Sequence, residues 1–260
     1  MHDLFSLQGK VAIVTGGAGY LGSSMVEALL ARGAAVAVAD PVDLPESFAS
    51  LQGRERLLHV RCDVAQTDSI RAALQEIHGH FGRIDILVNN VNIPGGGRGQ
   101  SNELEHMTDE VWSKGVDGAV GTVFRCTRES IPYLKEHGGA IVNNASMYGM
   151  VSPDPAMYGE LSKNPPNYGA GKSGVIQFTR YCAAHLAHYG IRANSVSPGP
   201  FPKPRLGYEE WFMNRLADKT MLKRTGRQHE VAGAVVFLAS PAADYITGVN
   251  IPVDGGWTAW

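Results

Sequence analysis

The feature that most constrains this chain is the regular alternation of short apolar runs with longer helical patterns. Most of the runs are almost continuously apolar, as is typical of strands buried on both faces of a parallel sheet. They predict strands at Val11–Thr15, Ala35–Ala39, Leu57–Cys62, Ile84–Asn89, Ala140–Asn144, Ile191–Ser197 and Val249–Val253. Helical patterns lie near residues 21–32, 67–80, 103–114, 117–136, 169–189 and 228–239. The alternation predicts an α/β fold with a doubly wound, mainly parallel seven-stranded sheet and helices on both faces.

The length of 260 residues suits one domain of this class, so we expect a single domain over residues 1–260. Apolar residues make up 44% of the chain, which is enough for a large core. Two proline-rich segments, residues 152–166 and 198–220, follow strands. Because sheets of this kind bind ligands beyond the carboxyl ends of their strands, we expect both segments to cover a substrate. The glycine-rich stretch at residues 94–99 predicts a further loop.

Charge and cysteine content exclude several classes of protein. The formal net charge is −2 and no long basic run occurs, so we expect no nucleic-acid partner. No uncharged apolar run approaches 18 residues, so we expect no membrane partner. The three cysteines are scattered and the histidines lack metal-ligand spacing, so we expect no disulfide and no metal. With no signal-peptide pattern at the start, a cytoplasmic location is expected.

A glycine-rich turn follows the first predicted strand directly. Its glycines Gly17, Gly19 and Gly22 have the spacing G-x-G-x-x-G, and a helical pattern follows. Such glycines let the backbone turn tightly and approach a pyrophosphate, which the positive end of the helix then attracts. The turn therefore predicts a dinucleotide site formed by Gly16, Gly17, Gly19, Tyr20, Leu21 and Gly22.

Asp40 closes the second predicted strand, 18 positions after Gly22. A carboxylate there can accept hydrogen bonds from the ribose hydroxyls of adenosine, and it would repel a 2′-phosphate. The next residue, Pro41, supplies no positive charge. We therefore expect NAD to be preferred over NADP. A solvated turn aspartate is the alternative.

A series of further motifs follows in a characteristic order along almost the whole chain. They are Cys62-Asp63-Val64, Asn89-Asn90, Ser146, Tyr168-x-x-x-Lys172, Pro198-Gly199, Tyr245-Ile246-Thr247-Gly248 and Asp254-Gly255-Gly256. With the glycine turn, this ordered set resembles the single-domain short-chain dehydrogenases/reductases, which have a Rossmann-like fold. The resemblance implies one dinucleotide-binding and catalytic domain that assembles as a homo-oligomer, a tetramer or a dimer. It also implies cofactor contacts by Asp63, Val64, Asn89, Tyr168, Lys172, Pro198 and Gly199.

The resemblance makes Ser146, Tyr168 and Lys172 catalytic, and their chemistry agrees. Removing a hydride from a carbinol carbon requires the hydroxyl to lose its proton, and a free tyrosine, with a pKa near ~10, needs help to accept it. Lys172 lies one helical turn from Tyr168, where its charge would favour the phenolate. Ser146 would hydrogen-bond the substrate oxygen. Tyr158 is a rival tyrosine, but Ser162 stands four positions after it.

Four departures from the family pattern bear on function. Tyr20 stands where the single-domain type has a glycine, and Ala119 stands where it often has a helix asparagine. Asn92 replaces the glycine of the usual Asn-Asn-Ala-Gly. Ser146 and Tyr168 are 22 positions apart, which is more than is common, and the excess is the 152–166 segment.

The sequence leaves the substrate open between several small polar classes. We expect hydride transfer between NAD and a secondary alcohol or ketone that is small and polar, sugar-like or acidic. Lys203 and Arg205 could contact an anionic group, or could be solvated. The turn at Tyr20 keeps an NAD-dependent sugar epimerase or dehydratase open, and Ala119 and Asn92 keep a non-catalytic dinucleotide-binding protein open. Trp257 and Trp260 are expected to cover a neighbouring subunit.

Overall fold

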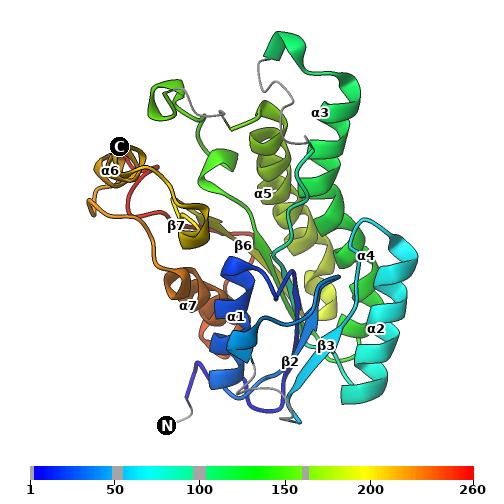
Figure 1. The fold of residues 1–260 in the computed structure, drawn as a ribbon. Coiled ribbons are helices and arrows are strands. Elements are labelled where there is room, and N and C mark those ends of the chain that lie inside the picture. Colours follow the sequence, from blue (N-terminus) through cyan, green and yellow to red (C-terminus); the bar gives the residue numbers. More distant parts are fainter. Residues whose placement is uncertain (1–2, 49–54, 96–103, 160–163) are drawn as a thin grey trace.

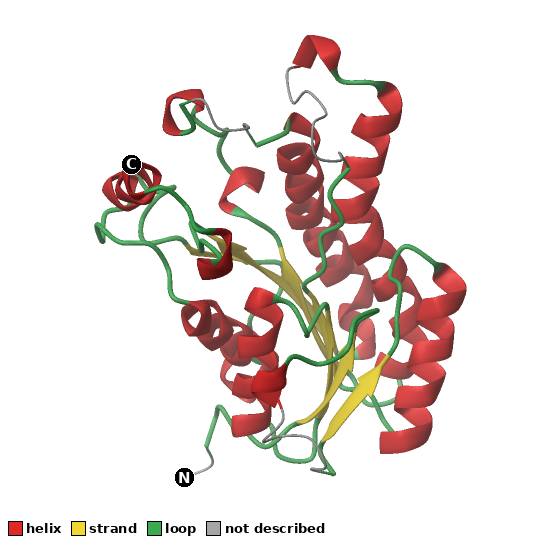
Figure 2. Cartoon of the chain, viewed as in Figure 1, coloured by secondary structure: helices red, strands yellow, loops and turns green. Residues whose placement is uncertain are grey.

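The computed structural model describes residues 3–48, 55–95, 104–159 and 164–260. It contains one sheet of seven parallel strands in the order β3-β2-β1-β4-β5-β6-β7 (Figures 1 and 2). The strands are β1 Val11–Thr15, β2 Ala35–Ala39, β3 Leu57–Val60, β4 Ile86–Asn89, β5 Gly139–Asn144, β6 Ile191–Pro198 and β7 Asn250–Val253. The predicted doubly wound parallel sheet is therefore confirmed.

Seven α-helices belong to the described residues. They are α1 Tyr20–Ala31, α2 Thr67–Phe81, α3 Asp109–Val116, α4 Thr122–Leu134, α5 Pro166–Leu186, α6 Glu210–Lys219 and α7 Gln228–Ala239. Helices α1 and α7 pack on one face of the sheet, and α2, α4 and α5 pack on the other (Figure 1). Each face buries its own apolar layer, which explains why the strands read as continuous apolar runs.

Several strands and helices differ from their predicted bounds, as where β4 begins at Ile86 and not at Ile84, and where α5 spans Pro166–Leu186 and not 169–189. The third strand ends at Val60, because β2 ends at Ala39 and the edge strand then loses its partner. The helix expected at 103–114 begins at Asp109, where the Thr108 side chain accepts a hydrogen bond from the Val111 amide. The helix expected at 117–136 begins with a π-helical turn at Asp117–Gly121. Residue 103, most of the 94–99 loop and residues 160–163 lie outside the described residues.

The π-helical turn has a packing cause that a helical pattern does not reveal. The Gly118 backbone approaches the segment after β4 so closely that a Cβ there would lie 2.0 Å from the Ile93 carbonyl oxygen. The Ile93 amide in turn donates a 3.0 Å hydrogen bond to the Gly118 carbonyl. The turn therefore holds the chain after β4 against the start of α4.

Strand order reverses between β1 and β4. From β1 the chain continues outward through β2 and β3 to one edge of the sheet, and from β4 it continues through β5, β6 and β7 to the other edge. In doubly wound sheets this reversal opens a crevice at the carboxyl ends of the strands, and ligands bind there. The loops that follow β1, β4 and β5 all begin at that edge. The fold thus places the glycine turn, Asn89, Asn90 and Ser146 at the edge formed by the carboxyl ends of the strands.

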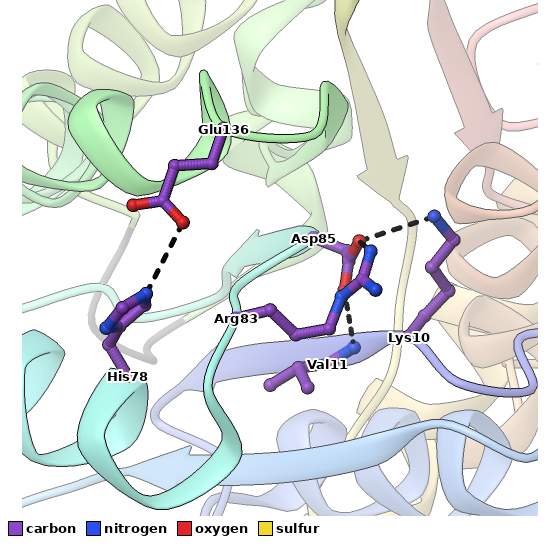
Figure 3. Close-up of polar contacts among 6 residues, drawn as sticks. All are labelled: Lys10, Val11, His78, Arg83, Asp85 and Glu136. Carbon is purple, nitrogen blue, oxygen red and sulfur yellow. Dashed lines mark hydrogen bonds and ion pairs between the residues drawn. The ribbon is translucent and has the colours of Figure 1, made fainter.

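Asp85 fixes the opposite, amino-terminal edge of the sheet (Figure 3). Its buried carboxylate accepts hydrogen bonds from the Val11 amide at 2.9 Å, from Arg83 Nε at 2.8 Å and from Lys10 Nζ at 3.3 Å. Burial alone would raise the pKa of Asp85, but these donors outweigh it and hold that pKa below its usual value. The ionised carboxylate therefore joins the starts of β1 and β4.

We expect Asp85→Asn to lower the free energy of unfolding at pH 7 by about 2–3 kcal/mol, because Arg83 and Lys10 lose their buried acceptor. Since the folded state lowers the pKa of Asp85, its stabilisation is present above the unfolded pKa near ~4 and is lost as the pH falls through the folded pKa. Urea unfolding at several pH values should show a wild-type advantage that shrinks below about pH 4. Asp68→Asn removes an exposed carboxylate and is the matched control. An equal effect of both substitutions would contradict this role.

Candidate active site

The glycine turn after β1 leaves no room for side chains at its tightest points. Gly16 has a φ of +65°, which favours glycine, and a Cβ on Gly22 would lie 2.2 Å from the Gly16 carbonyl oxygen. A Cβ on Gly17 would lie 2.9 Å from the Val38 side chain on β2. The backbone is therefore closed on itself at the start of α1, which leaves the helix amides facing the crevice.

Asp40 lies against this turn at the end of β2. Its carboxylate accepts hydrogen bonds from the Ala18 amide at 3.1 Å and from the Val42 amide at 3.2 Å. The residue is only 6% exposed. Asp40 is therefore fixed beside the glycine turn and does not project into solvent from a mobile turn.

Asn90 is a residue of this site that the sequence analysis did not single out. Its side-chain amide donates to the carbonyl oxygens of Thr15 and Gly16 at 3.2 and 3.1 Å. Its side-chain oxygen accepts from Asn144 at 2.9 Å. Asn90 thus links the ends of β1, β4 and β5. The only sequence signal for this role was that Asn90 directly follows Asn89. Because side chains alternate along a strand, the two asparagines point to opposite faces of the sheet.

The side chain of Asn89 points into the protein interior. Its amide donates to Thr127 on α4 at 3.1 Å and to Asn143 on β5 at 2.8 Å. Asn143 in turn donates to Thr179 on α5 at 2.8 Å. All four side chains are buried, so they form a polar ladder that joins two helices to two strands below the crevice. A cofactor contact by Asn89 stays a prediction.

The other residues that the family resemblance assigns to the cofactor also lie in loops at the carboxyl edge. Asp63 is exposed and caps its own turn by accepting from the Ala65 amide at 2.9 Å. The Val64 carbonyl accepts a 3.1 Å hydrogen bond from Arg125. Gly199 lies so close to the C-terminal segment that a Cβ there would lie 2.5 Å from Asp254 Cα. Their contacts with a cofactor, and those of Pro198, stay predictions.

Ser146, Tyr168 and Lys172 come together where β5 ends and α5 begins. Ser146 follows β5 and is 6% exposed, and its side chain lies close enough to that of Tyr168, in the first turn of α5, to affect the pKa of the phenol. Burial raises the pKa of Tyr168 above its usual value near 10, and the Ser146 side chain opposes this rise. The three side chains predicted from separate motifs are thus neighbours.

Lys172 lies one turn beyond Tyr168, with Nζ 5.8 Å from the centroid of the Tyr168 ring. It is only 2% exposed, and burial lowers the pKa of its ammonium to about 8. Nζ donates a 2.8 Å hydrogen bond to the carbonyl oxygen of Asn144, its one acceptor among the described residues. An ammonium has three donors, so two remain for a ligand.

The π-helical turn brings Ala119 to α5 on this side of the site. Ala119 is fully buried, and a Cβ on Gly171, the neighbour of Lys172, would lie 2.6 Å from the Ala119 side chain. Its carbonyl oxygen accepts a 3.0 Å hydrogen bond from the Thr122 hydroxyl. The nearby Asp117 is paired with Arg125 at 2.8 Å, which lowers the pKa of that carboxyl. Neither side chain therefore offers a proton relay to Lys172.

The two segments that were expected from the sequence to cover a substrate, 152–166 and 198–220, meet beside Tyr168. Arg215 on α6 donates a 2.8 Å hydrogen bond to the Ala156 carbonyl, and Gly159 lies against the Trp211 ring. We call the apolar group that they enclose the lid cluster. It consists of Met147, Tyr148, Met157, Tyr158, Tyr168, Phe212, Met213, Leu216 and Trp257.

Trp257 was expected to cover a neighbouring subunit, but it is already buried within its own chain. Trp257 is 3% exposed within the single chain, because it packs in the lid cluster with its ring 6.5 Å from that of Tyr148. The positive-φ glycines Gly255 and Gly256 turn the chain back so that the indole reaches this position. Trp260 is 65% exposed, and its ring nitrogen donates to the Lys219 carbonyl at 3.0 Å.

Two buried polar atoms near the carboxyl ends of β4 and β5 match the needs of a dinucleotide. The side-chain oxygens of Asn92 and Asn144 have no hydrogen-bond partner among the described residues. Buried polar groups are normally satisfied, so these acceptors indicate a missing donor such as water or a ligand hydroxyl. With the glycine turn and the free donors of Lys172, the residues present fit a nicotinamide dinucleotide.

Other kinds of site find no support in the described part of the chain. It holds no group of three or more His, Cys, Asp or Glu side chains arranged for a metal ion. No described helix is both long and apolar enough to cross a membrane. Cys62, Cys126 and Cys182 are all buried and unpaired.

Comparison with known proteins agrees with this geometry. A family model described as enoyl-(acyl carrier protein) reductase matches residues 17–258. The chain is 36% identical over 258 residues to (5R,7aS)-5-hydroxy-7a-methyl-1-oxo-2,3,5,6,7,7a-hexahydro-1H-indene-carboxyl-CoA reductase from Mycobacterium tuberculosis, covering 95% of this chain and 92% of that protein. It is 34% identical over 281 residues to cyclohexanol dehydrogenase from a Rhodococcus species, covering 99% of each.

A solved structure has the same fold over almost the full length. The short-chain dehydrogenase from Leptospira borgpetersenii with bound NAD⁺ superposes with a TM-score of 0.86 and 30% identity, covering 99% of this chain and 96% of that one. The relatives are dehydrogenases and reductases of alcohols and ketones. The chain therefore belongs to the short-chain dehydrogenases/reductases, and it is an oxidoreductase that acts on secondary alcohols or ketones.

Proposed function

We propose that this oxidoreductase transfers a hydride between NAD and a secondary alcohol or ketone of a small polar or cyclic compound, with Tyr168 as the proton-transferring residue. The observation that carries the proposal is that Tyr168 lies beside the buried Lys172, with Nζ 5.8 Å from its ring centroid, and near enough to Ser146 for that side chain to affect its pKa. A hydroxyl group that loses hydride from its carbon must also lose its proton, and this arrangement offers a phenol for that proton.

Each of the three side chains has a distinct task in this proposal. Ser146 hydrogen-bonds the substrate oxygen and orients it toward the Tyr168 hydroxyl. The Lys172 ammonium lies close enough to favour the phenolate, and its spare donors bind hydroxyls of the nicotinamide ribose. The nicotinamide, when bound, accepts or supplies the hydride. The closed lid cluster excludes water around the reacting oxygen and thereby strengthens these interactions.

The residues proposed to hold the cofactor follow the crevice from one side to the other. The amides of the glycine turn and of Tyr20, Leu21 and Gly22 bind the pyrophosphate. Asp40 accepts from the adenosine ribose, and Asp63 and the Val64 backbone hold the adenine. The residues proposed at the nicotinamide end are Asn89, Tyr168, Lys172, Pro198 and Gly199. The bound NAD⁺ of the Leptospira borgpetersenii relative supports the choice of NAD.

The lid cluster supports a cyclic or polar substrate more than an acidic one. Its members are apolar or phenolic, the adjacent Arg215 donates to the Ala156 carbonyl, and Lys203 is exposed. Burying a carboxylate without a cation is costly, so the cluster favours an uncharged substrate body. Cyclohexanol dehydrogenase from Rhodococcus and the hexahydroindene reductase from Mycobacterium tuberculosis, by their names, act on ring compounds, which supports the same class.

Two other functions have specific features in their favour. The turn at Tyr20 suits a sugar epimerase or dehydratase that holds its NAD tightly, and NAD retained through purification at one molecule per chain would favour it. The alanine at position 119 suits a non-catalytic dinucleotide-binding protein. The placement of Ser146 near Tyr168 weighs against the latter, because a binding protein has no use for it.

Tyr168→Phe should lower kcat by about 10²- to 10⁴-fold, which is the usual contribution of a general acid–base group. The affinity for NADH, measured by fluorescence titration, should change little because the ring remains. Tyr189→Phe removes a hydroxyl just before β6, at the other edge of the sheet, and is the control that should keep full activity. A Tyr168→Phe enzyme with wild-type kcat would disprove the assignment.

Asp40→Ala should reduce the preference for NADH over NADPH by about tenfold or more, because it removes a charged acceptor for the ribose and the repulsion of a 2′-phosphate. Side-by-side fluorescence titrations with the two cofactors give the ratio of dissociation constants. Asp43→Ala removes an exposed carboxylate that is paired with Arg61 and should leave the ratio unchanged. Unchanged discrimination in Asp40→Ala would remove Asp40 from the cofactor site.

A homo-oligomer is part of the proposal because α4 and α5 present exposed aromatic side chains. Phe124 is 43% exposed and Tyr181 is 56% exposed, and the Phe178 ring lies 6.0 and 6.4 Å from theirs. Such a patch is typical of an interface between copies. The three buried free thiols are compatible with the cytoplasm, which we propose as the location.

Sedimentation velocity should show a dimer or tetramer for the wild type, and Tyr181→Asp should shift it toward smaller species because a charge would be buried in the interface. Tyr181→Phe, which keeps the ring and adds no charge, is the matched control and should leave the assembly unchanged. A wild-type chain that sediments as a monomer at micromolar concentration would contradict the proposal.

A further inference from the structure

The lid cluster contains a pair of tyrosines that the proposed chemistry does not use. Tyr148 lies two residues after Ser146, and Tyr158 follows the short 3₁₀ helix at Pro155–Met157. Their hydroxyl oxygens are 2.7 Å apart, so one donates to the other. The pair therefore joins the segment after β5 to the covering segment 152–166.

The surroundings of this pair are apolar on the described sides. The Tyr148 ring packs edge-on against Trp257, and the Tyr158 ring lies 6.0 Å from Phe212. Tyr148 is 7% exposed. Polar groups in an apolar enclosure are costly unless they are hydrogen-bonded, so a second partner at these hydroxyls would be favourable.

The pair keeps unused hydrogen-bonding capacity. Two phenols joined by one hydrogen bond retain one O–H donor and several acceptor lone pairs. Among the described residues, neither hydroxyl has a further hydrogen-bond partner. Burial raises the pKa of Tyr148 and of Tyr158, so both phenols stay protonated and the free donor persists at neutral pH.

The pair is also close to the reacting centre. Tyr148, Tyr158 and Tyr168 all belong to the lid cluster. The Tyr148 amide donates a 3.1 Å hydrogen bond to the Ser146 side chain. A small molecule whose oxygen reaches Ser146 and Tyr168 can therefore place a second oxygen near the pair.

We propose that the Tyr148–Tyr158 hydroxyl pair binds a second, uncharged oxygen of the substrate and so selects compounds that carry two oxygens, such as cyclic diols and hydroxyketones. This inference rests on the proposed function, because the first oxygen is the one that reacts at Tyr168. An anionic oxygen fits less well. Asp154 is near enough to affect Tyr148 electrostatically, and the Arg215 guanidinium beside the cluster donates to the Ala156 carbonyl.

The kinetic test compares substrates with and without the second oxygen. We expect the wild type to oxidise the best of the cyclohexanediol isomers with a kcat/KM roughly tenfold above that for cyclohexanol, which is the effect of about one hydrogen bond. Tyr158→Phe and Tyr148→Phe should each remove this preference while leaving the value for cyclohexanol within about threefold, and the double variant should add little. Tyr189→Phe, at the opposite edge of the sheet, should keep the preference.

A purely structural latch between the two segments would give a different result. Loss of a latch would lower kcat/KM for the diol and for cyclohexanol in the same proportion, so the ratio would not move. That outcome, or a wild type without preference for any diol, would overturn the proposal.

A binding measurement separates this proposal from the proposed function. In the Tyr168→Phe variant with NAD⁺ present, calorimetric titration should show tighter binding of the diol than of cyclohexanol. Adding Tyr158→Phe should abolish the difference. If the diol binds more tightly but the wild type oxidises no alcohol, the proposed function fails, and the proposal that the Tyr148–Tyr158 pair binds a second oxygen stands. If binding shows no preference, that proposal fails whether or not the wild type turns over.

Discussion

Two asparagine side chains hold the carboxyl edge of the sheet together, and the rest of the site depends on them. The Asn90 amide donates to the Gly16 carbonyl in the glycine turn, and its oxygen accepts from Asn144. The Asn144 carbonyl in turn accepts from Lys172. Asn90 and Asn144 therefore connect the glycine turn to Lys172 through three hydrogen bonds. A displacement of the glycine turn would therefore be transmitted to Lys172 through Asn90 and Asn144 alone.

This connection explains why the site can be formed by strands that are distant in sequence. In a parallel sheet the strand ends meet at one edge, but adjacent loops are otherwise free to move apart. Asn90 bonds across β1, β4 and β5, and the ladder from Thr127 to Thr179 ties the same strands to α4 and α5 below. The polar network thus makes the crevice a rigid base, and the lid cluster closes over it from the other side.

Much of the fold could be predicted from the sequence, because a strand buried on both faces leaves an unmistakable apolar run. Ser146, Tyr168 and Lys172 were also predictable, since the motif spacing fixes the helix face and the chain order fixes the neighbouring strand. The π-helical turn at Asp117–Gly121 was not, because Gly118 is there for a contact with Ile93 that lies outside any local pattern. The position of Trp257 was misjudged, and the role of Asn90 was overlooked, for a similar reason. Which face a loop side chain takes depends on tertiary contacts, and those contacts leave no periodicity to read.

The role proposed for Lys172 carries a cost in stability, because the ammonium is buried. Its ammonium has a pKa of about 8 in place of the ordinary 10.5, so keeping it charged at neutral pH costs about 3 kcal/mol relative to an exposed lysine. The Asn144 carbonyl alone does not offset this cost. A methionine of similar length would be more stable at this position, yet it could neither stabilise a phenolate nor donate to a ribose. The buried ammonium charge is tolerated because the hydrogen bond between Asn90 and Asn144 holds the Asn144 carbonyl in place as its acceptor. A ligand whose hydroxyls satisfy the two remaining donors would recover part of the cost, so cofactor binding and the retention of charge on Lys172 should reinforce one another.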